Sequence, residues 1–405
     1  MANVTAGSKP NTDWASISLM IVSGLGALLF FGVALLMGSL SIFGRIYPPT
    51  GDADPTVMGM LAWGAGLMGA VLVPGFLAAL MRLTGWHLPG WLNFGRRLAL
   101  GLAPLGIILW VVVLLLGNAF SKDAFWGWAL LPPLNALAVA LPIFFLVFLA
   151  LRGLNGSRTR RWGWWTFGLT VSPLVIIIIE AFFLGAAMIL AMVAFMSDPS
   201  LEWFWMDMQS GTPSTSSAQQ LIMTLEPYFQ RPEVVFWVIA LLAGFVPLLE
   251  EALKPMGLWL MAGRKLTPQE GFAAGILSGA GFALAESLGA VSNVAHEGWI
   301  NLAFMRGGTD LLHIVCSGLI GWALVATWND GKNLRLALTY LLAAGLHMAW
   351  NAASLLEAFY ADWTVIPSVT VPVFSMMILE ILVMGMMVIL LFMNWYLRKE
   401  MKWIL

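Results

Sequence analysis

The chain has 405 residues, of which 60% are hydrophobic and only 10% are charged, and its formal net charge is −1. Its mean hydropathy of +0.86 excludes a water-soluble globule and indicates a polytopic membrane protein. The near-neutral charge gives no support for a nucleic-acid partner. The single cysteine, Cys316, excludes an intramolecular disulfide and a thiolate metal cluster.

Ten apolar runs are long enough to cross the roughly 30 Å hydrocarbon core of a bilayer. The first is too long for the apolar segment of a signal peptide, so we expect it to remain as a membrane helix. The sequence therefore predicts an all-α, polytopic bundle of about ten transmembrane helices. The runs lie near residues 16–42, 57–81, 98–119, 126–151, 165–196, 234–261, 270–294, 308–327, 335–358 and 366–397.

When the predicted spans alternate across the membrane, most basic residues fall on the same side. Fifteen of the twenty lysines and arginines fall on one side, which the positive-inside rule identifies as cytoplasmic. Both termini then lie in the cytoplasm. We expect a multi-pass protein of the cell membrane, in a bacterium or an archaeon. The five basic residues that do not fall on that side are Arg45, Lys122, Arg231 and Arg306, outside the spans, and Lys254, within one.

The charge pattern also divides the chain. Residues 1–196 hold five predicted spans with almost no charge and are interpreted as a supporting bundle. Residues 197–233 are predicted to form an extracytoplasmic loop rich in acidic and aromatic side chains. Residues 234–360 carry spans six to nine and are the predicted catalytic core, and residues 361–405 form the last span and a basic cytoplasmic tail.

Polar side chains interrupt four consecutive spans of the predicted core. An ionisable group at bilayer depth costs about 2.5–3.5 kcal/mol on insertion scales, so such groups indicate function. Residues three or four apart share a helix face, which gives each of these spans one polar face. The residues are Glu250, Glu251 and Lys254 in the sixth span, Glu286 in the seventh, His313 in the eighth, and His347 with Asn351 in the ninth.

Three carboxylates near one lysine cannot all stay ionised cheaply at low dielectric. The site should therefore hold a proton, a bound cation or a protonated histidine. Carboxylates near imidazoles and an amide can activate a water molecule and stabilise an oxyanion. These are the requirements of hydrolysis.

Four motifs in this order carry a resemblance to a known family. They are Glu250-Glu251-Ala-Leu-Lys254, Phe282-Ala-Leu-Ala-Glu286, the span containing His313, and His347-Met-Ala-Trp-Asn351. Together, and in membrane spans, they resemble the PrsW-type intramembrane proteases, relatives of the CAAX prenyl proteases and the bacteriocin-immunity proteins. The motifs cover residues 246–355, and Asn351 stands where some relatives have an acid.

The resemblance implies cleavage of a membrane-anchored protein in the bilayer, for example an anti-sigma-factor-like regulator. Glu250 or Glu251 would be the base that activates water, and Glu286 a second acid or an orienting group. His313 and His347, helped by Asn351, would polarise the carbonyl or bind a metal. Lys254, Phe282 and Ser317 would support them. Metal dependence stays open; if a divalent metal such as zinc is used, Glu251, Glu286, His313 and His347 are the expected ligands.

Other interpretations fit parts of the pattern. The same groups suit an ion- or proton-coupled transporter, or a catalytically silent protein that binds a membrane partner. The first motif also fits a buried structural ion pair, and close packing explains Ser317 better than nucleophilic catalysis does. Depth raises a conflict, because the predicted spans place His313 near the outer surface and Glu250 at mid-membrane or below.

Overall fold

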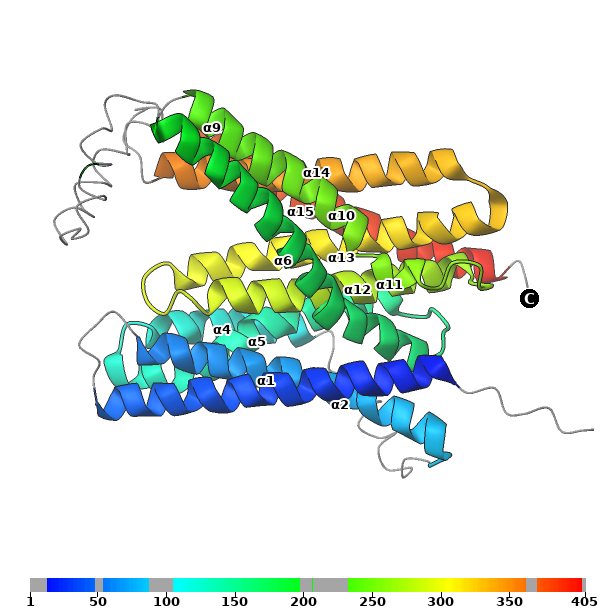
Figure 1. Cartoon of the computed structure of the whole chain (residues 1–405), viewed down its shortest axis with the longest axis horizontal. Coiled ribbons are helices and arrows are strands. Elements are labelled where there is room, and N and C mark those ends of the chain that lie inside the picture. The colour runs from blue at the N-terminus through cyan, green and yellow to red at the C-terminus, as the bar shows by residue number, and fades with distance from the viewer. Residues whose placement is uncertain are drawn as a thin grey trace, which may run out of the picture. The chain divides into compact units, whose positions relative to one another are not determined.

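The computed structural model describes residues 13–47, 54–86, 105–196, 206, 232–361 and 370–402. All regular elements among them are helices (Figure 1). The helices are α1 (Trp14–Ile46), α2 (Pro55–Thr84), α4 (Gly106–Phe120), α5 (Ala124–Leu151), α6 (Arg158–Met196), α9 (Pro232–Ile239), the π-helix η3 (Ala240–Phe245), α10 (Val246–Leu253), α11 (Met256–Trp259), α12 (Pro268–Val291), α13 (Trp299–Asp330), α14 (Asn333–Ala361) and α15 (Thr370–Lys402).

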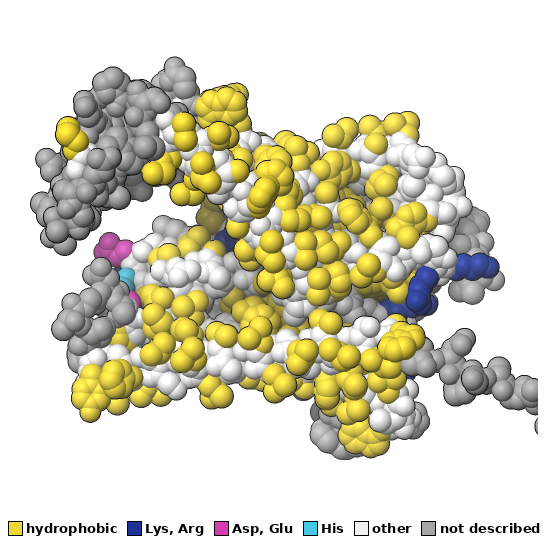
Figure 2. All heavy atoms as spheres, viewed as in Figure 1, with side chains coloured by type: hydrophobic (Ala, Val, Ile, Leu, Met, Phe, Trp, Pro, Cys, Tyr) yellow, Lys and Arg dark blue, Asp and Glu magenta, His cyan; other side chains and the backbone are white. Residues whose placement is uncertain are grey.

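The helix lengths confirm the prediction of an all-α, multi-pass membrane bundle. Within the described ranges, nine helices or helix runs are long and apolar enough to span a bilayer, and α4 is a shorter apolar helix of 15 residues. Hydrophobic side chains cover most of the visible surface of the helices (Figure 2). Residues 98–104 of the third predicted span and 197–231 of the predicted extracytoplasmic loop, Met206 apart, lie outside the described residues.

Aspartate caps explain where three of the apolar helices begin. The Asp54 carboxylate accepts a hydrogen bond from the Thr56 N–H at 2.7 Å, and Asp13 and Asp123 cap α1 and α5 in the same way. Each cap satisfies a backbone donor that the first helical turn leaves without a partner. The hydrogen bond from the Ser16 hydroxyl holds the pKa of the Asp13 carboxyl below its usual range.

The chain forms two compact units that interleave in sequence. The first unit contains residues 1–170 and 280–310, and the second contains 171–279 and 311–405. Three long helices, α6, α12 and α13, therefore contribute one part to each unit. The functional division into a supporting half and a catalytic half stays a prediction.

In the first unit, a buried polar link joins α5 to segments from far along the chain. The Asn135 amide donates to the Ser292 hydroxyl at 2.9 Å, and the indole N–H of Trp299 donates to the Asn135 carbonyl oxygen at 3.1 Å. All three residues are buried. Their polar groups satisfy one another where lipid offers no partner, which fixes how these helices pack.

In the second unit, α12 and α13 cross with their backbones close together. A Cβ atom on Gly275 would overlap the carbonyl oxygen of Ser317, and Gly271 and Gly321 face each other in the same way. Small residues permit this approach, as is usual between membrane helices. This close crossing fixes the position of α13 along the axis of α12.

One helix boundary corrects two sequence-based predictions. Helix α13 begins at Trp299 and not near residue 308, so His313 lies fourteen residues into the helix, about 21 Å from its start. His313 is therefore a mid-helix residue, which removes the predicted conflict of depth with Glu250. Arg306 was predicted to lie outside the spans, but it also belongs to α13.

Candidate active site

The polar residues of the sixth predicted span lie at a break in that span. The helix passes through η3 into α10 and ends at Leu253, with Lys254 as its C-cap. Pro255 explains the break, because proline has no N–H to continue the helix. Glu250 and Glu251 therefore lie in the last turn before the break, and both are buried.

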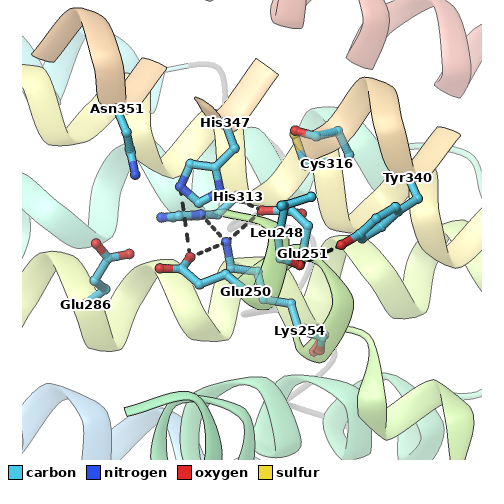
Figure 3. A network of polar contacts seen from close by, with 12 residues as sticks. Leu248, Glu250, Glu251, Lys254, Glu286, His313, Cys316, Tyr340, His347 and Asn351 are labelled. Atoms are coloured by element: carbon cyan, nitrogen blue, oxygen red, sulfur yellow. Dashed lines mark hydrogen bonds and ion pairs between the residues drawn. The ribbon is translucent and has the colours of Figure 1, made fainter. Parts of the chain in front are cut away.

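Lys254 joins the two glutamates to α13. Its Nζ atom lies 2.8 Å from Glu250 Oε2, 2.8 Å from Glu251 Oε1 and 2.6 Å from His313 Nδ1. Figure 3 shows these side chains converging from α10, with its C-cap, and from α13. An ammonium group can only donate, so His313 Nδ1 is the acceptor in this contact. Lys254 is fully buried and carries one formal positive charge against two carboxylates.

His347 completes the group from α14. Its Nδ1 lies 2.9 Å from Glu251 Oε1, and its Nε2 lies 3.9 Å from Glu250 Oε2. An ionised carboxylate only accepts, so His347 donates through Nδ1–H. The imidazole rings of His313 and His347 stand edge to face with their centroids 5.2 Å apart. Both rings are buried, at 1% and 2% exposure.

One carboxylate oxygen of Glu251 takes part in none of these contacts. Oε1 accepts from Lys254 and His347, whereas Oε2 is buried and accepts no hydrogen bond from any residue that the structure describes. An open pocket of about 320 Å³ has Glu251 among its lining residues. Its other lining residues include Ile320, Leu324, Leu336 and Tyr340. The geometry thus leaves Glu251 with a free acceptor and a space beside it.

Asn351 and Ser317 lie one turn beyond the two histidines and have packing contacts. The Asn351 amide donates to the Leu242 carbonyl oxygen in η3 at 3.2 Å, so it links α14 to the π-helical turn. Such turns inside α-helices are frequent at functional sites. Ser317 packs against Gly275 and Gly279 at the α12–α13 crossing.

Four of the predicted site residues can hold a metal ion together. Glu250, Glu251, His313 and His347 each offer one ligand atom, and these atoms all lie within 4.8 Å of one another. Two imidazoles with a carboxylate are a donor set typical of catalytic zinc. The free Oε2 of Glu251 is a further buried acceptor without a protein donor. The residues therefore fit a divalent metal.

Glu286 belongs to the first unit, where it has partners that the sequence did not predict. Arg306 lies 3.0 Å from Glu286 Oε1 and donates to the Ser287 hydroxyl at 2.9 Å. Ser287 in turn donates to the buried Asp310 carboxylate at 2.6 Å. Helical spacing could have identified Arg306 from the sequence, because residues 306, 310, 313 and 317 lie on one face of a helix. The preceding motif residue, Phe282, is buried in the same unit.

Comparison with known proteins identifies one family. A model of the PrsW family intramembrane metalloproteases matches residues 172–384, which is more than half of the chain. The matched region contains every residue of the site described above. Neither the curated proteins nor the solved structures include one that matches the chain.

Proposed function

Because this chain belongs to the PrsW family of intramembrane metalloproteases, we propose that its Glu251 is the base of peptide hydrolysis and that Glu250, His313 and His347 hold the metal. Family membership makes the protein an intramembrane peptidase that acts on a membrane-embedded substrate. The assignment of individual residues is our proposal. The observation that carries it is the free, buried Oε2 of Glu251 beside two imidazoles and a second carboxylate.

Glu251 has the properties of an oriented general base. Its Oε1 accepts from His347 and, in the metal-free site, from Lys254, which leaves Oε2 to accept the proton of the attacking water molecule. The proton taken from water is later needed by the amine nitrogen that leaves when the peptide C–N bond breaks. Glu251 can hold that proton between the two steps, so atoms and charge balance.

The other residues stabilise the charge that develops. A divalent ion held by Glu250, His313 and His347 would supply Lewis-acid polarisation of the scissile carbonyl. Without the metal, the Lys254 ammonium offsets the negative charge of the two carboxylates, so that both stay ready to accept. Low dielectric around these buried groups strengthens each electrostatic contact.

The substrate and the location follow from the resemblance of the motifs. We propose a membrane-anchored regulatory protein, of which an anti-sigma-factor-like protein is an example, as substrate in a bacterial or archaeal cell membrane. Glu286 is proposed as a second acid or orienting group, held by Arg306. Asn351 is proposed to support His347 by joining α14 to η3.

The test uses the purified full-length protein in lipid vesicles with a panel of tagged single-span reporter proteins. Glu251→Gln and His347→Ala are compared with Glu380→Gln, a control that removes an exposed carboxylate of α15. We expect cleavage by the unsubstituted protein and by Glu380→Gln, and none by the two site variants. Cleavage by folded Glu251→Gln at the unsubstituted rate would reject its role as the base.

A further inference from the structure

The Lys254 ammonium lies among the same atoms that a metal ion needs. It contacts two of the three residues proposed to hold the metal, at 2.8 Å from Glu250 Oε2 and 2.6 Å from His313 Nδ1, and it lies 2.8 Å from Oε1 of the proposed base, Glu251. A zinc ion bound through such atoms lies about 2.0–2.2 Å from each of them. An ion held through Glu250 Oε2 and His313 Nδ1 would therefore need the position that Nζ takes between these two atoms. Two cations cannot share that position, because their repulsion is strong at low dielectric.

We propose that Lys254 is an internal cation that competes with the metal ion for this donor group and so sets the metal affinity of the site. The inference rests on the proposed function, because it takes Glu250 and His313 as donors to the metal. With the ammonium in place, the two carboxylates are neutralised in part by the chain itself. With a metal in place, the ammonium lies elsewhere.

The backbone of Lys254 is anchored, so that only its side chain needs to move. Two hydroxyls from other helices donate to the Lys254 carbonyl, Ser278 at 2.7 Å and Ser172 at 3.3 Å. All of these residues belong to the second unit. Displacement of the ammonium would therefore move the flexible side chain and not the backbone.

Competition of this kind has a measurable consequence. The apparent dissociation constant equals the intrinsic constant divided by the fraction of molecules whose donors are open. If the ammonium occupies the donors in nine molecules out of ten, its removal tightens metal binding about tenfold. Methionine is a suitable replacement, because it has a similar unbranched shape and no charge.

The experiment measures zinc binding by the full-length protein in detergent, by competition with a fluorescent chelator. Lys254→Met is compared with Lys332→Met, which removes an exposed lysine paired with Asp330. We expect zinc to bind to Lys254→Met at least about tenfold more tightly than to the unsubstituted protein. We expect Lys332→Met to bind like the unsubstituted protein. A second readout is the rise in unfolding temperature on adding zinc, which should be larger for Lys254→Met.

A second pair of variants covers the case in which Lys254→Met does not fold. Glu250→Gln and the double variant Glu250→Gln/Lys254→Met are compared, because the double variant keeps the formal charge of the unsubstituted group. Tighter zinc binding by the double variant than by Glu250→Gln supports the proposal. Equal or weaker zinc binding after loss of Lys254, in either background, overturns it.

The outcomes separate this proposal from the proposed function. Cleavage that depends on Glu251, with zinc binding unchanged by loss of Lys254, leaves the function standing and rejects the competition. Tighter zinc binding without cleavage of any reporter supports the competition and counts against the assigned catalytic roles.

Discussion

Replacing Glu251 by glutamine tests both the chemistry and the charge balance of the site. The side chain keeps its shape and its acceptor oxygen but loses its charge. General acid–base groups contribute about 10²–10⁴-fold to rate, so we expect cleavage to fall by at least about a hundredfold. Glu250→Gln should lose activity through weaker metal binding, which excess zinc should partly restore. Zinc should not restore Glu251→Gln.

The effect on stability follows from the contacts of each carboxylate. A hydrogen bond to a charged group contributes about 1 kcal/mol more than one between neutral groups. Glu251 accepts two such bonds, from Lys254 and His347, so Glu251→Gln should lose about 2 kcal/mol. Glu250 is paired with Lys254 alone at short distance, so Glu250→Gln should lose about 1 kcal/mol.

Both glutamine variants should fold, because Lys254 keeps one carboxylate partner in each. Lys254→Met should lose more, about 3–5 kcal/mol in the absence of metal, since it leaves two buried carboxylates without a cation. Thermal unfolding in detergent with chelator ranks the three variants, and reporter cleavage in vesicles measures the rates. The reasoning is refuted if folded Glu251→Gln cleaves within about tenfold of the unsubstituted rate, which is below the range for a general base.

Three further predictions concern the helices around the site. Arg306→Gln should reduce cleavage as strongly as Glu286→Gln if Arg306 holds Glu286, and the double variant should be no worse than either single variant; additive losses in the reporter assay would contradict this coupling. Gly275→Ala should destabilise the protein by about 1–3 kcal/mol, because its methyl group would overlap the Ser317 carbonyl. Gly289→Ala, where the added atom meets nothing within 4 Å, is its control in thermal unfolding, and equal unfolding temperatures would reject the close crossing. Chelator should abolish cleavage by the unsubstituted protein and added zinc should restore it, whereas full activity in chelator would show that the reaction needs no metal.

Sequence alone was enough for the class of fold and for the functional class. A run of about 20 apolar residues crosses a bilayer as a helix, because lipid offers no hydrogen-bond partner. Each backbone N–H and C=O group must then find its partner within the same helix. Intramembrane charge is costly, so Glu250, Glu251 and Lys254 indicated a candidate site without any coordinates. The four motifs pointed to the family that the comparison then identified.

Only the tertiary structure decided which of these residues meet and at what depth. Helix spacing placed His313 and His347 on polar faces, but it could not bring the two rings to 5.2 Å or orient His347 Nδ1 toward Glu251. The start of α13 at Trp299 was hidden because the residues before 308 are less apolar than the rest of the helix. The sequence could not show that Lys254 contacts His313 as well as both glutamates. Such contacts depend on how the second unit packs α10, α13 and α14 together, which is a property of distant segments and not of local pattern.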